Sequence, residues 1–261
     1  MRKPLFFVQN NLVQPLTIPV ARFAHSRGHV LEDRSSTRAF SVHDCGIDWG
    51  AFHPVLPYGS VQFVRKLRAS APLAQYVHYS EDAFSTAHWT RVLGERAVNH
   101  RGRLMLSGDV TALLNDGPAM HVRPEREDKA FTAAVFDASA WAELTCKREL
   151  AQTLPCWVSP PVAIEAEWRC WVLGSEVVEI SQYRRDGEHH RVPAFTPELV
   201  AVAQTLANAY LPAPCVVMDI ARTADGHQVL EYNPIHSSGW YAARTDRVLA
   251  QWLEWSLRHF G

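Results

Sequence analysis

The sequence lacks any long run of apolar residues. A membrane-spanning helix needs roughly 20 apolar residues in succession, and no segment of the 261-residue chain approaches that length. Residues 1–8 combine two basic residues with a short apolar run, which Gln-Asn-Asn interrupts at residues 9–11. That run is too short for a secretory signal peptide and is typical of a first buried strand. We therefore expect a soluble, cytoplasmic protein.

An excess of charge of either sign is also missing. The chain has 26 Lys and Arg residues against 27 Asp and Glu residues, which gives a net charge of -1. No global field therefore attracts DNA, RNA or an anionic membrane. We expect no membrane partner. Nucleic acid is disfavoured but not excluded, because a local basic groove could still bind it, and the oligomeric state is not indicated.

Cysteine patterns for a disulfide framework or a zinc site are absent. The five cysteines are an odd number, are widely spaced and include no Cys-x-x-Cys pair. This pattern indicates reduced thiols. The closest pair among the 13 histidines, His189 and His190, would point to opposite faces of a strand, so a solvated turn explains the pair better than a metal site.

Internal repeats and low-complexity segments are missing too, and 47% apolar residues are ordinary for a globular protein. We divide the chain into an N-terminal α/β subdomain at residues 1–80, a first lobe at 81–155 and a second lobe at 156–261. In the first part, a strand at 55–58 precedes an amphipathic helix at 61–67. Gly59 and Ser60 at the entrance of that helix either cap it or hold an anion on free amides, and a cap is the favoured interpretation.

In the first lobe we predict strands at 119–123 and 131–136, separated by the charged segment 124–129. The second lobe is predicted to contain two hairpins with a helix between them. Thr196 caps this helix and Pro197 begins it. A last amphipathic helix spans residues 247–259.

The most informative segment is the predicted hairpin at residues 216–233. Two strand-like runs flank an Asp-Gly turn, and a three-residue loop at 224–226 with Gly226 in the left-handed conformation would join them. In that register Asp219 lies opposite Glu231, and Asn233 shares the face of Glu231. Paired carboxylates destabilise a hairpin unless a cation lies between them, and Mg²⁺ is the natural candidate. The alternative is a solvated outer face.

The other hairpin spans residues 164–183 and turns at Gly174 and Ser175. Glu167, Arg169 and Trp171 share one of its faces. Two roles for Arg169 stay open: its guanidinium stacks on the neighbouring tryptophans, or it reaches a phosphate, which its forked geometry suits.

Four motifs occur together in a recognisable order. They are Arg123-Pro124, Lys129-Ala130-Phe131-Thr132, Glu167-Trp168-Arg169, and Asp219 followed by Glu231-Tyr232-Asn233-Pro234. Their order and spacing resemble the ATP-grasp superfamily over residues 120–245. Ser238-Gly239-Trp240-Tyr241, after the Glu-x-Asn motif, makes the chain similar to the small bacterial and phage clade of that superfamily, which is named for an arginine and two lysines.

The resemblance implies an α+β protein with the ATP-grasp fold, in which two α+β lobes clamp a nucleotide behind a small α/β N-terminal subdomain. It implies ATP and Mg²⁺ as cofactors, with Asp219, Glu231 and Asn233 as metal ligands. Arg123 would approach the adenine or α-phosphate, and Lys129 would cover the phosphates. Arg169 would neutralise the transferred phosphoryl group, so Arg169 and Lys129 are the catalytic candidates. The other implied nucleotide-binding residues are Glu167 and the hinge residues Trp157, Val158 and Ser159.

The glycine-rich phosphate loop that is usual in the superfamily is absent. Residues 125–128 read Glu-Arg-Glu-Asp in its place, and Ala133 occupies a position where glycine is expected. A catalytically degenerate nucleotide-binding scaffold is therefore one alternative function.

The resemblance implies a ligase that activates a carboxylate as an acyl phosphate and joins it to an amine, with small molecules or peptides as substrates. A phosphotransferase acting on a hydroxyl is the other alternative. Candidate substrate residues follow the metal motif. His236 would contact substrate or act as a base, or form a loop hydrogen bond. Ser237, Ser238 and Gly239 would line the acceptor pocket or form a turn, and Tyr241, next to Trp240, would stack on a ligand or pack in the core.

Overall fold

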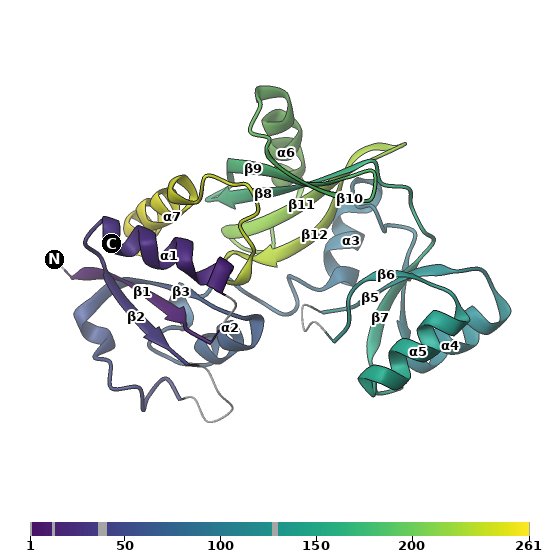
Figure 1. The fold of residues 1–261 in the computed structure, drawn as a ribbon, viewed down its shortest axis with the longest axis horizontal. Coiled ribbons are helices and arrows are strands. Elements are labelled where there is room, and N and C mark those ends of the chain that lie inside the picture. The colour runs from purple at the N-terminus through teal and green to yellow at the C-terminus, as the bar shows by residue number, and fades with distance from the viewer. Residues whose placement is uncertain (1, 12–13, 36–40, 127–129, 261) are drawn as a thin grey trace.

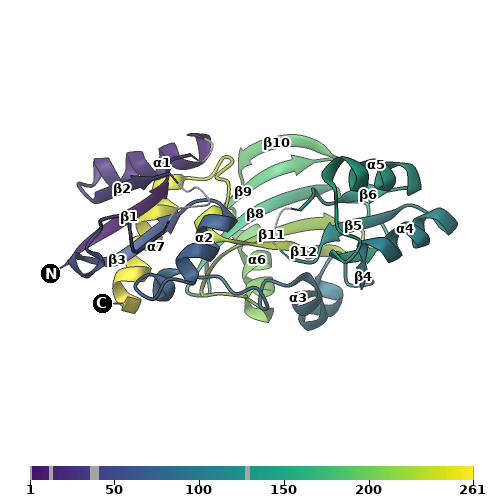
Figure 2. The same cartoon turned by 90° about the horizontal axis from the view of Figure 1, so that it is seen from below.

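The fold consists of three β-sheets with helices packed against them (Figure 1). The structure is a computed structural model that describes residues 2–11, 14–35, 41–126 and 130–260. The three sheets lie in a row when the molecule is seen from below, with the five-stranded sheet in the middle (Figure 2). The α+β class expected from the sequence is confirmed.

The N-terminal sheet is parallel and has the strand order β2-β1-β3. Strands β1 and β3 are buried over continuous runs of five residues, as is typical of parallel strands covered on both faces, whereas β2 at the edge is only partly buried. The C-terminal helix returns to this sheet, so purple and yellow ribbons lie side by side in Figure 1. The elements of this region are β1 Lys3–Gln9, α1 Gln14–Ser26, β2 Val30–Arg34, β3 Phe52–Tyr58, α2 Val61–Arg68 and α7 Thr245–Phe260.

The second sheet along the chain is four-stranded and antiparallel, with the order β4-β7-β5-β6, and it lies at one end of the row of sheets. Helices α4 and α5 cover one face of it (Figure 1), around the buried ring of Trp141, which makes edge contacts with Phe131 and Phe136. The elements here are α3 Thr86–Leu93, β4 Arg103–Leu106, α4 Ser107–Asp116, β5 Met120–Pro124, β6 Ala134–Phe136, α5 Ala138–Arg148 and β7 Pro155–Ser159.

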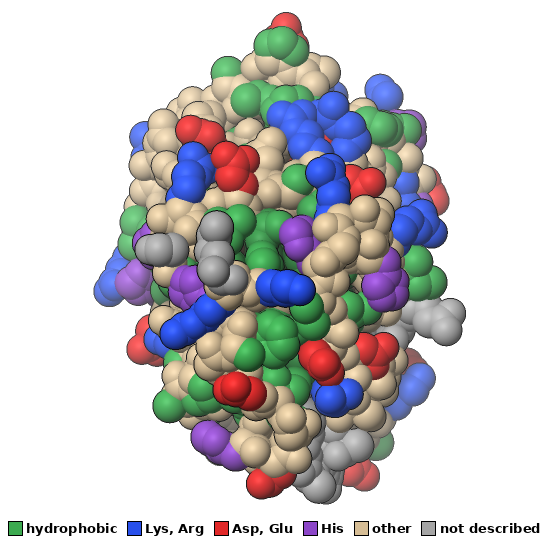
Figure 3. Space-filling view, turned by 90° about the vertical axis from the view of Figure 1, so that its left-hand side faces the viewer, with side chains coloured by type: hydrophobic (Ala, Val, Ile, Leu, Met, Phe, Trp, Pro, Cys, Tyr) green, Lys and Arg blue, Asp and Glu red, His purple; other side chains and the backbone are tan. Residues whose placement is uncertain are grey.

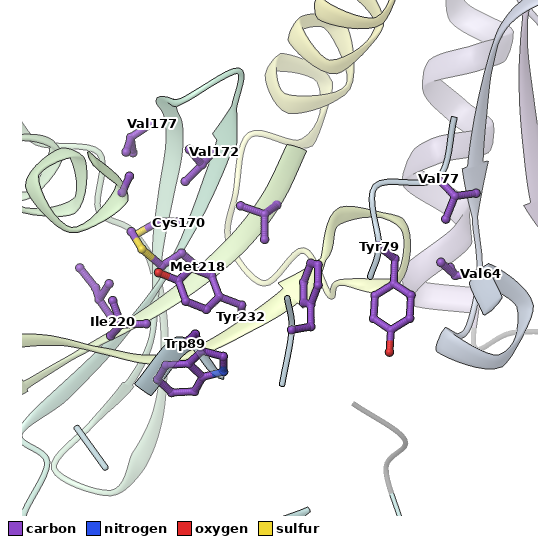
Figure 4. Close-up of a cluster of buried hydrophobic side chains, with 14 of the residues drawn as sticks. Val64, Val77, Tyr79, Trp89, Cys170, Val172, Val177, Met218, Ile220 and Tyr232 are labelled. Carbon is purple, nitrogen blue, oxygen red and sulfur yellow. The ribbon is translucent and has the colours of Figure 1, made fainter. Parts of the chain in front are cut away.

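The last region forms a five-stranded antiparallel sheet of order β10-β9-β8-β11-β12. Its buried face shares one core with α3, α6 and the N-terminal subdomain, and Figure 4 shows Tyr232, Trp89 and Tyr79 in that core. The elements are β8 Ala166–Leu173, β9 Glu176–Arg185, β10 Glu188–Pro193, α6 Pro197–Ala209, β11 Cys215–Thr223 and β12 Gly226–Pro234. The division at residues 80 and 155 stays a prediction.

Most predicted helices and strands are present, with ends that differ from the prediction by up to three residues. The helix after residue 60 and the helix capped by Thr196 form as expected. The strand predicted at 131–136 begins only at Ala134. The reason is that Phe131 turns inward to pack against Trp141, 5.4 Å between ring centroids.

The entrance of α2 is a helix cap and not an anion site. Ser60 Oγ accepts a hydrogen bond from the Phe63 amide at 3.2 Å. The Ser60 amide donates to Gln9 Oε1 at 2.7 Å, and the Gly59 amide donates to the His236 carbonyl at 2.8 Å. These amides are therefore engaged within the protein, and the structure contradicts the anion alternative.

The β11–β12 hairpin reaches the predicted pairing by a different route. Thr223 pairs with Gly226, so the loop has two residues and not the predicted three. A bulge at Leu230 then restores the register, because Ile220 pairs with Val229 and Asp219 pairs with Glu231. A bulge adds one residue to one strand, which compensates for the shorter loop. The β8–β9 hairpin turns at Gly174 and Ser175 as predicted, both with positive φ.

No helix in the described ranges has the length and apolar character to cross a membrane. Figure 3 shows acidic and basic side chains interspersed over the face seen from the left of Figure 1, with one group of Lys and Arg near its top. This face therefore carries no extended field of one sign.

Candidate active site

A cavity of about 470 Å³ lies between the four-stranded and five-stranded sheets. Its walls include many of the residues predicted as a site: Arg123, Arg169, Glu231, Asn233, Ser237, Ser238, Gly239 and Tyr241. A larger cavity of about 710 Å³ beside α4 and α5 contains none of the predicted site residues. The chemistry of the smaller cavity makes it the candidate active site.

Asp219 and Arg169 form a buried ion pair beside this cavity. The two residues are cross-strand neighbours on β11 and β8. Arg169 Nε donates to Asp219 Oδ1 at 2.8 Å and Nη2 donates to Oδ2 at 2.6 Å. The Asp219 side chain is 1% exposed and that of Arg169 is 7% exposed. Both carboxylate oxygens therefore hold a guanidinium donor, in the forked geometry that gives strong pairs.

Glu231 lies next to this pair and holds a second arginine. Arg123 Nη2 is 3.3 Å from Glu231 Oε2, and Asn233 Nδ2 donates to Glu231 Oε1 at 2.9 Å. Arg123 Nη1 also donates to the carbonyl of the bulge residue Leu230 at 3.1 Å. Arg123 comes from β5 of the four-stranded sheet, so this contact ties the two lobes together.

The buried charges shift the ionisation of this cluster. Burial raises the pKa of Asp219 and the negative charge of Glu231 adds to the rise, while the charge and the hydrogen bonds of Arg169 oppose it. Burial also acts to raise the pKa of Glu231, but Arg123, Asn233 and Arg169 outweigh it and the net shift is downward. Glu231 is therefore firmly ionised, and Asp219 is a carboxylate in this structure because both of its oxygens accept hydrogen bonds from Arg169.

The predicted placement of Asp219 opposite Glu231, with Asn233 beside Glu231, is confirmed. The solvated-face alternative is wrong, because Asp219 is buried. In the described part of the chain the cations next to the carboxylates are guanidinium groups of Arg123 and Arg169. These arginines already supply the positive charge that the pair of carboxylates requires.

The donor set nevertheless fits Mg²⁺. Two carboxylates and the amide oxygen of Asn233 are hard oxygen ligands, and Mg²⁺ takes few protein ligands because it keeps positions for water and phosphate. The described residues contain no group of three or more His, Cys, Asp or Glu side chains that could hold a metal. Because only two carboxylates are available, a metal site here would also need the amide oxygen of Asn233 and phosphate oxygens as ligands.

Arg169 does not stack on tryptophans, which corrects one of the two predicted alternatives. Its guanidinium carbon lies 4.8 Å from the Tyr241 ring centroid and 5.8 Å from that of Tyr183. The guanidinium reaches the cavity wall, where a phosphate would be within reach of its remaining donors. Glu167, on the same strand, is buried and does not line the cavity.

The loop that replaces the glycine-rich segment is anchored at its start. The Glu125 carboxylate accepts hydrogen bonds from the Ser85 hydroxyl and from the amides of Thr86 and Ala87 at the start of α3. Arg126 Nη1 lies 2.5 Å from Glu81 Oε2. Glu125 therefore caps a helix and is not a phosphate ligand. The predicted Lys129 lies outside the described residues, so its role stays a prediction.

The predicted hinge residues do not reach the cavity. Strand β7 lies between β4 and β5, so the backbone groups of Trp157 and Val158 face neighbouring strands. Trp157 Nε1 donates to the Asn99 carbonyl at 3.0 Å, and Ser159 Oγ donates to Asn99 Oδ1 at 3.1 Å. These contacts place Trp157, Val158 and Ser159 in the sheet, and their role in nucleotide binding stays a prediction.

His236 has a structural role, which corrects its prediction as a substrate residue. It is fully buried, its Nδ1–H donates to the Pro57 carbonyl at 2.9 Å, and its Nε2 accepts from the His78 amide at 2.8 Å. These partners require a neutral ring with the proton on Nδ1, and burial lowers the pKa to about 4. The loop hydrogen bond, named as the alternative, is confirmed.

The residues after His236 approach the cavity in different ways. Ser238 Oγ donates to the Pro234 carbonyl at 2.7 Å, so its hydroxyl is used in a turn. The Gly239 carbonyl accepts from Arg169 Nη1 at 3.3 Å. Tyr241 lines the cavity with a 39% exposed side chain and a positive φ of 48°. Positive φ is unfavourable for a bulky residue and is typical of functional sites.

The residues that hold the loop at residues 241–244, called the Tyr241 loop below, were not predicted from the sequence. Three positions on one face of β9 contact it: Glu179 Oε2 accepts from Arg244 at 2.9 Å, Ser181 Oγ accepts from the Ala242 amide at 3.1 Å, and the Tyr183 ring stacks on Tyr241 at 4.8 Å. The alternation of 179, 181 and 183 along the predicted strand was a usable signal. Their partners lie about 60 residues away, and no local pattern in the sequence indicates them.

Comparisons with known proteins agree with this architecture. The family model described as ATP-grasp domain, R2K clade family 3, matches residues 53–253. No curated protein sequence matches the chain.

Many solved structures are similar to the chain, and three of them follow, at identities that establish the fold alone. With the family match, they confirm the predicted ATP-grasp fold. A RimK domain protein ATP-grasp from Sphaerobacter thermophilus DSM 20745 has 15% identity and a TM-score of 0.63, covering 96% of this chain and 99% of that one. D-alanine–D-alanine ligase from Bacillus anthracis has 11% identity and a TM-score of 0.66, covering 98% of each chain. The ATP-grasp ligase PsnB, complexed with minimal precursor, has 15% identity and a TM-score of 0.55, with 89% and 90% covered.

Proposed function

Because the chain belongs to the ATP-grasp superfamily, within R2K clade family 3, we propose that it is an ATP- and Mg²⁺-dependent ligase that joins a carboxylate to an amine. The observation that carries this proposal is the convergence of Arg123, Arg169, Glu231 and Asn233 on one cavity between two lobes. Two of the similar structures are named as ligases, which supports the same class of reaction.

In this proposal Asp219, Glu231 and Asn233 hold Mg²⁺. The bound ion would neutralise and orient phosphate oxygens. Arg123 and Arg169 supply forked donors to the same phosphates, and Lys129 is proposed to cover them. Two buried guanidinium groups stabilise developing negative charge more strongly than they would in water.

The reaction needs no protein nucleophile. A substrate carboxylate oxygen attacks the γ-phosphorus of ATP and ADP leaves, which forms an acyl phosphate. An amine nitrogen then attacks the carbonyl carbon, phosphate leaves, and the nitrogen loses a proton. The protein's part is to align these groups and to balance their charge. We assign the acceptor end to Ser237, Gly239 and Tyr241, which line the cavity beside Arg169.

We also place the reaction in the cytoplasm. Cys45, Cys146, Cys170 and Cys215 are free thiols, and two of them are buried in the core. Free thiols are typical of proteins in reducing compartments.

The test begins with ATP binding by calorimetry, with and without Mg²⁺, on the wild type, on Glu231→Ala and on Glu176→Ala. Glu176 is an exposed carboxylate at the turn end of β9 and serves as the matched control. We expect Mg²⁺-dependent binding in the wild type and the control, and its loss in Glu231→Ala. A folded wild type that binds no ATP would favour the degenerate scaffold instead.

A second stage identifies the reaction. ADP release is screened with pairs of carboxylic acids and amines, and products are examined by mass spectrometry. An amide with stoichiometric ADP and phosphate supports the ligase. A stable phosphorylated hydroxyl without amide would replace it with the phosphotransferase.

A further inference from the structure

Arg169 already binds Asp219, which is one of the three proposed metal ligands. Each oxygen of the Asp219 carboxylate accepts a hydrogen bond from the guanidinium, at 2.8 and 2.6 Å. Both side chains are buried, so water screens the pair little. A divalent cation that approaches Asp219 therefore meets a positive charge already bonded to its ligand.

The charges of the cluster balance without any added ion. Asp219 and Glu231 face Arg123 and Arg169, with Arg169 Nη2 also 3.9 Å from Glu231 Oε1. A divalent cation alone would leave an excess of two positive charges in a buried region. A cation that arrives with a polyphosphate brings negative charge with it, which offsets this positive excess and gives the arginines a second anion to bind.

We propose that Arg169 competes with the divalent cation for Asp219, so that the cation binds tightly only together with the nucleotide, whose phosphates take over the Arg169 guanidinium. This inference rests on the proposed function for the identity of the polyphosphate. It assigns Arg169 a role before the reaction, as an internal counter-ion that orders metal and nucleotide binding.

The surroundings of Arg169 suit such an exchange. Its guanidinium lies against the rings of Tyr241 and Tyr183, and its Nη1 donates to the Gly239 carbonyl at 3.3 Å. These contacts do not involve Asp219, so they can hold the side chain at the cavity wall when the ion pair opens. Binding is then reciprocal: the nucleotide raises the affinity for metal by the same factor by which metal raises the affinity for nucleotide.

The first experiment uses Mn²⁺ alone as the probe, with bound ion measured by electron paramagnetic resonance. Arg169→Met is compared with the wild type, with Arg169→Lys, which keeps the charge, and with Arg184→Met, an exposed arginine on the neighbouring strand. We expect Arg169→Met to bind Mn²⁺ at least about tenfold more tightly than the wild type, because a nearby positive charge has been removed. Arg184→Met should stay within about twofold of the wild type, and Arg169→Lys, which keeps the charge but loses the forked geometry, should lie between the wild type and Arg169→Met.

Tight binding of Mn²⁺ alone by the wild type would overturn the proposal, as would a folded Arg169→Met variant that binds Mn²⁺ no better. Since this comparison contains no nucleotide, failure of the ligase function does not affect it. Failure of ATP binding would remove the proposed function and leave the competition for Asp219 to be judged by Mn²⁺ alone.

A second measurement covers the case in which Arg169→Met does not fold. The Nε–H resonance of Arg169 is followed by nitrogen-15 NMR in the wild type and assigned with Arg169→Lys. We expect it to remain in place with Mg²⁺ alone and to move when Mg²⁺ and the ATP analogue AMP-PNP are added together. Movement with Mg²⁺ alone would contradict the proposal.

Discussion

Two buried polar clusters in this protein hold their ionisable groups in different charge states. Around the cavity, Asp219 and Glu231 carry charge and are matched by Arg169 and Arg123. Beside α7, His236 and His78 stack with ring centroids 5.4 Å apart, and both have lowered pKa values because they are buried. The first cluster keeps its charges and opens to a cavity, whereas the second stays neutral and joins elements.

The difference shows that burial alone does not identify a functional site. Residues of both clusters were predicted as site residues from one continuous motif region, since His236 follows Asn233 by three positions. What separates them is the use of their polar atoms. Both ring nitrogens of His236 have partners within the protein, while the guanidinium of Arg169 reaches the cavity wall.

The strongest way to break the charged cluster is Asp219→Ala. Removing one partner of a buried ion pair leaves Arg169 uncompensated, so we expect a loss of about 3–5 kcal/mol in the free energy of unfolding. Urea unfolding measures it, with Asp225→Ala in the hairpin loop as control. An effect below about 1 kcal/mol, as for a surface pair, would show that the pair contributes little to stability.

The matching change in the neutral cluster is His236→Ala. It leaves the Pro57 carbonyl and the His78 amide buried without a partner, so we expect a loss of about 3 kcal/mol in the free energy of unfolding. ATP affinity of the folded variant should be unchanged, which calorimetry can check against the exposed His189→Ala. A large loss of ATP affinity in a folded variant would return His236 to the site.

Acid should weaken the neutral cluster selectively. The pKa of His236 is lowered from its ordinary value of 6.5 to about 4 in the folded protein. Between these values the unfolded chain binds the extra proton, so stabilisation is complete above pH 6.5 and falls as pH decreases toward 4.

From pH 7 to pH 5 we expect a loss of about 2 kcal/mol from this group. Urea unfolding at several pH values measures the slope, and His236→Gln should flatten it. A slope that is the same in His236→Gln would assign the effect to other groups, such as His78, whose pKa shift has the same direction.

The smallest expected effect is that of a substitution beside the cavity, at a residue that holds the Tyr241 loop. Glu179→Gln weakens the contact to Arg244 that holds the Tyr241 loop, and we expect a loss of about 1 kcal/mol in the free energy of unfolding. Because Tyr241 lines the cavity and Glu179 does not, the KM for the acceptor should rise while ATP affinity stays constant. Equal effects on both ligands would indicate a general loss of structure.

The local sequence pattern was sufficient to predict a contact that is made within one hairpin. Asp219 and Glu231 face each other because side chains alternate along strands and a short loop limits the register. The predicted loop was one residue too long, yet the bulge at Leu230 kept the same pair together. The bulge could not be predicted, since the Arg123 contact to the Leu230 carbonyl comes from another sheet.

The sequence by itself determined the hairpins, the amphipathic helices and the set of motifs that identify the superfamily, because these depend on residues near one another in the chain. Tertiary structure alone decided which partner each polar group takes. Asp219 finds Arg169 across 50 residues, and His236 finds Pro57 across 179. Such pairings follow from the packing of distant strands, and the free energy that selects them belongs to the whole core and not to any local pattern.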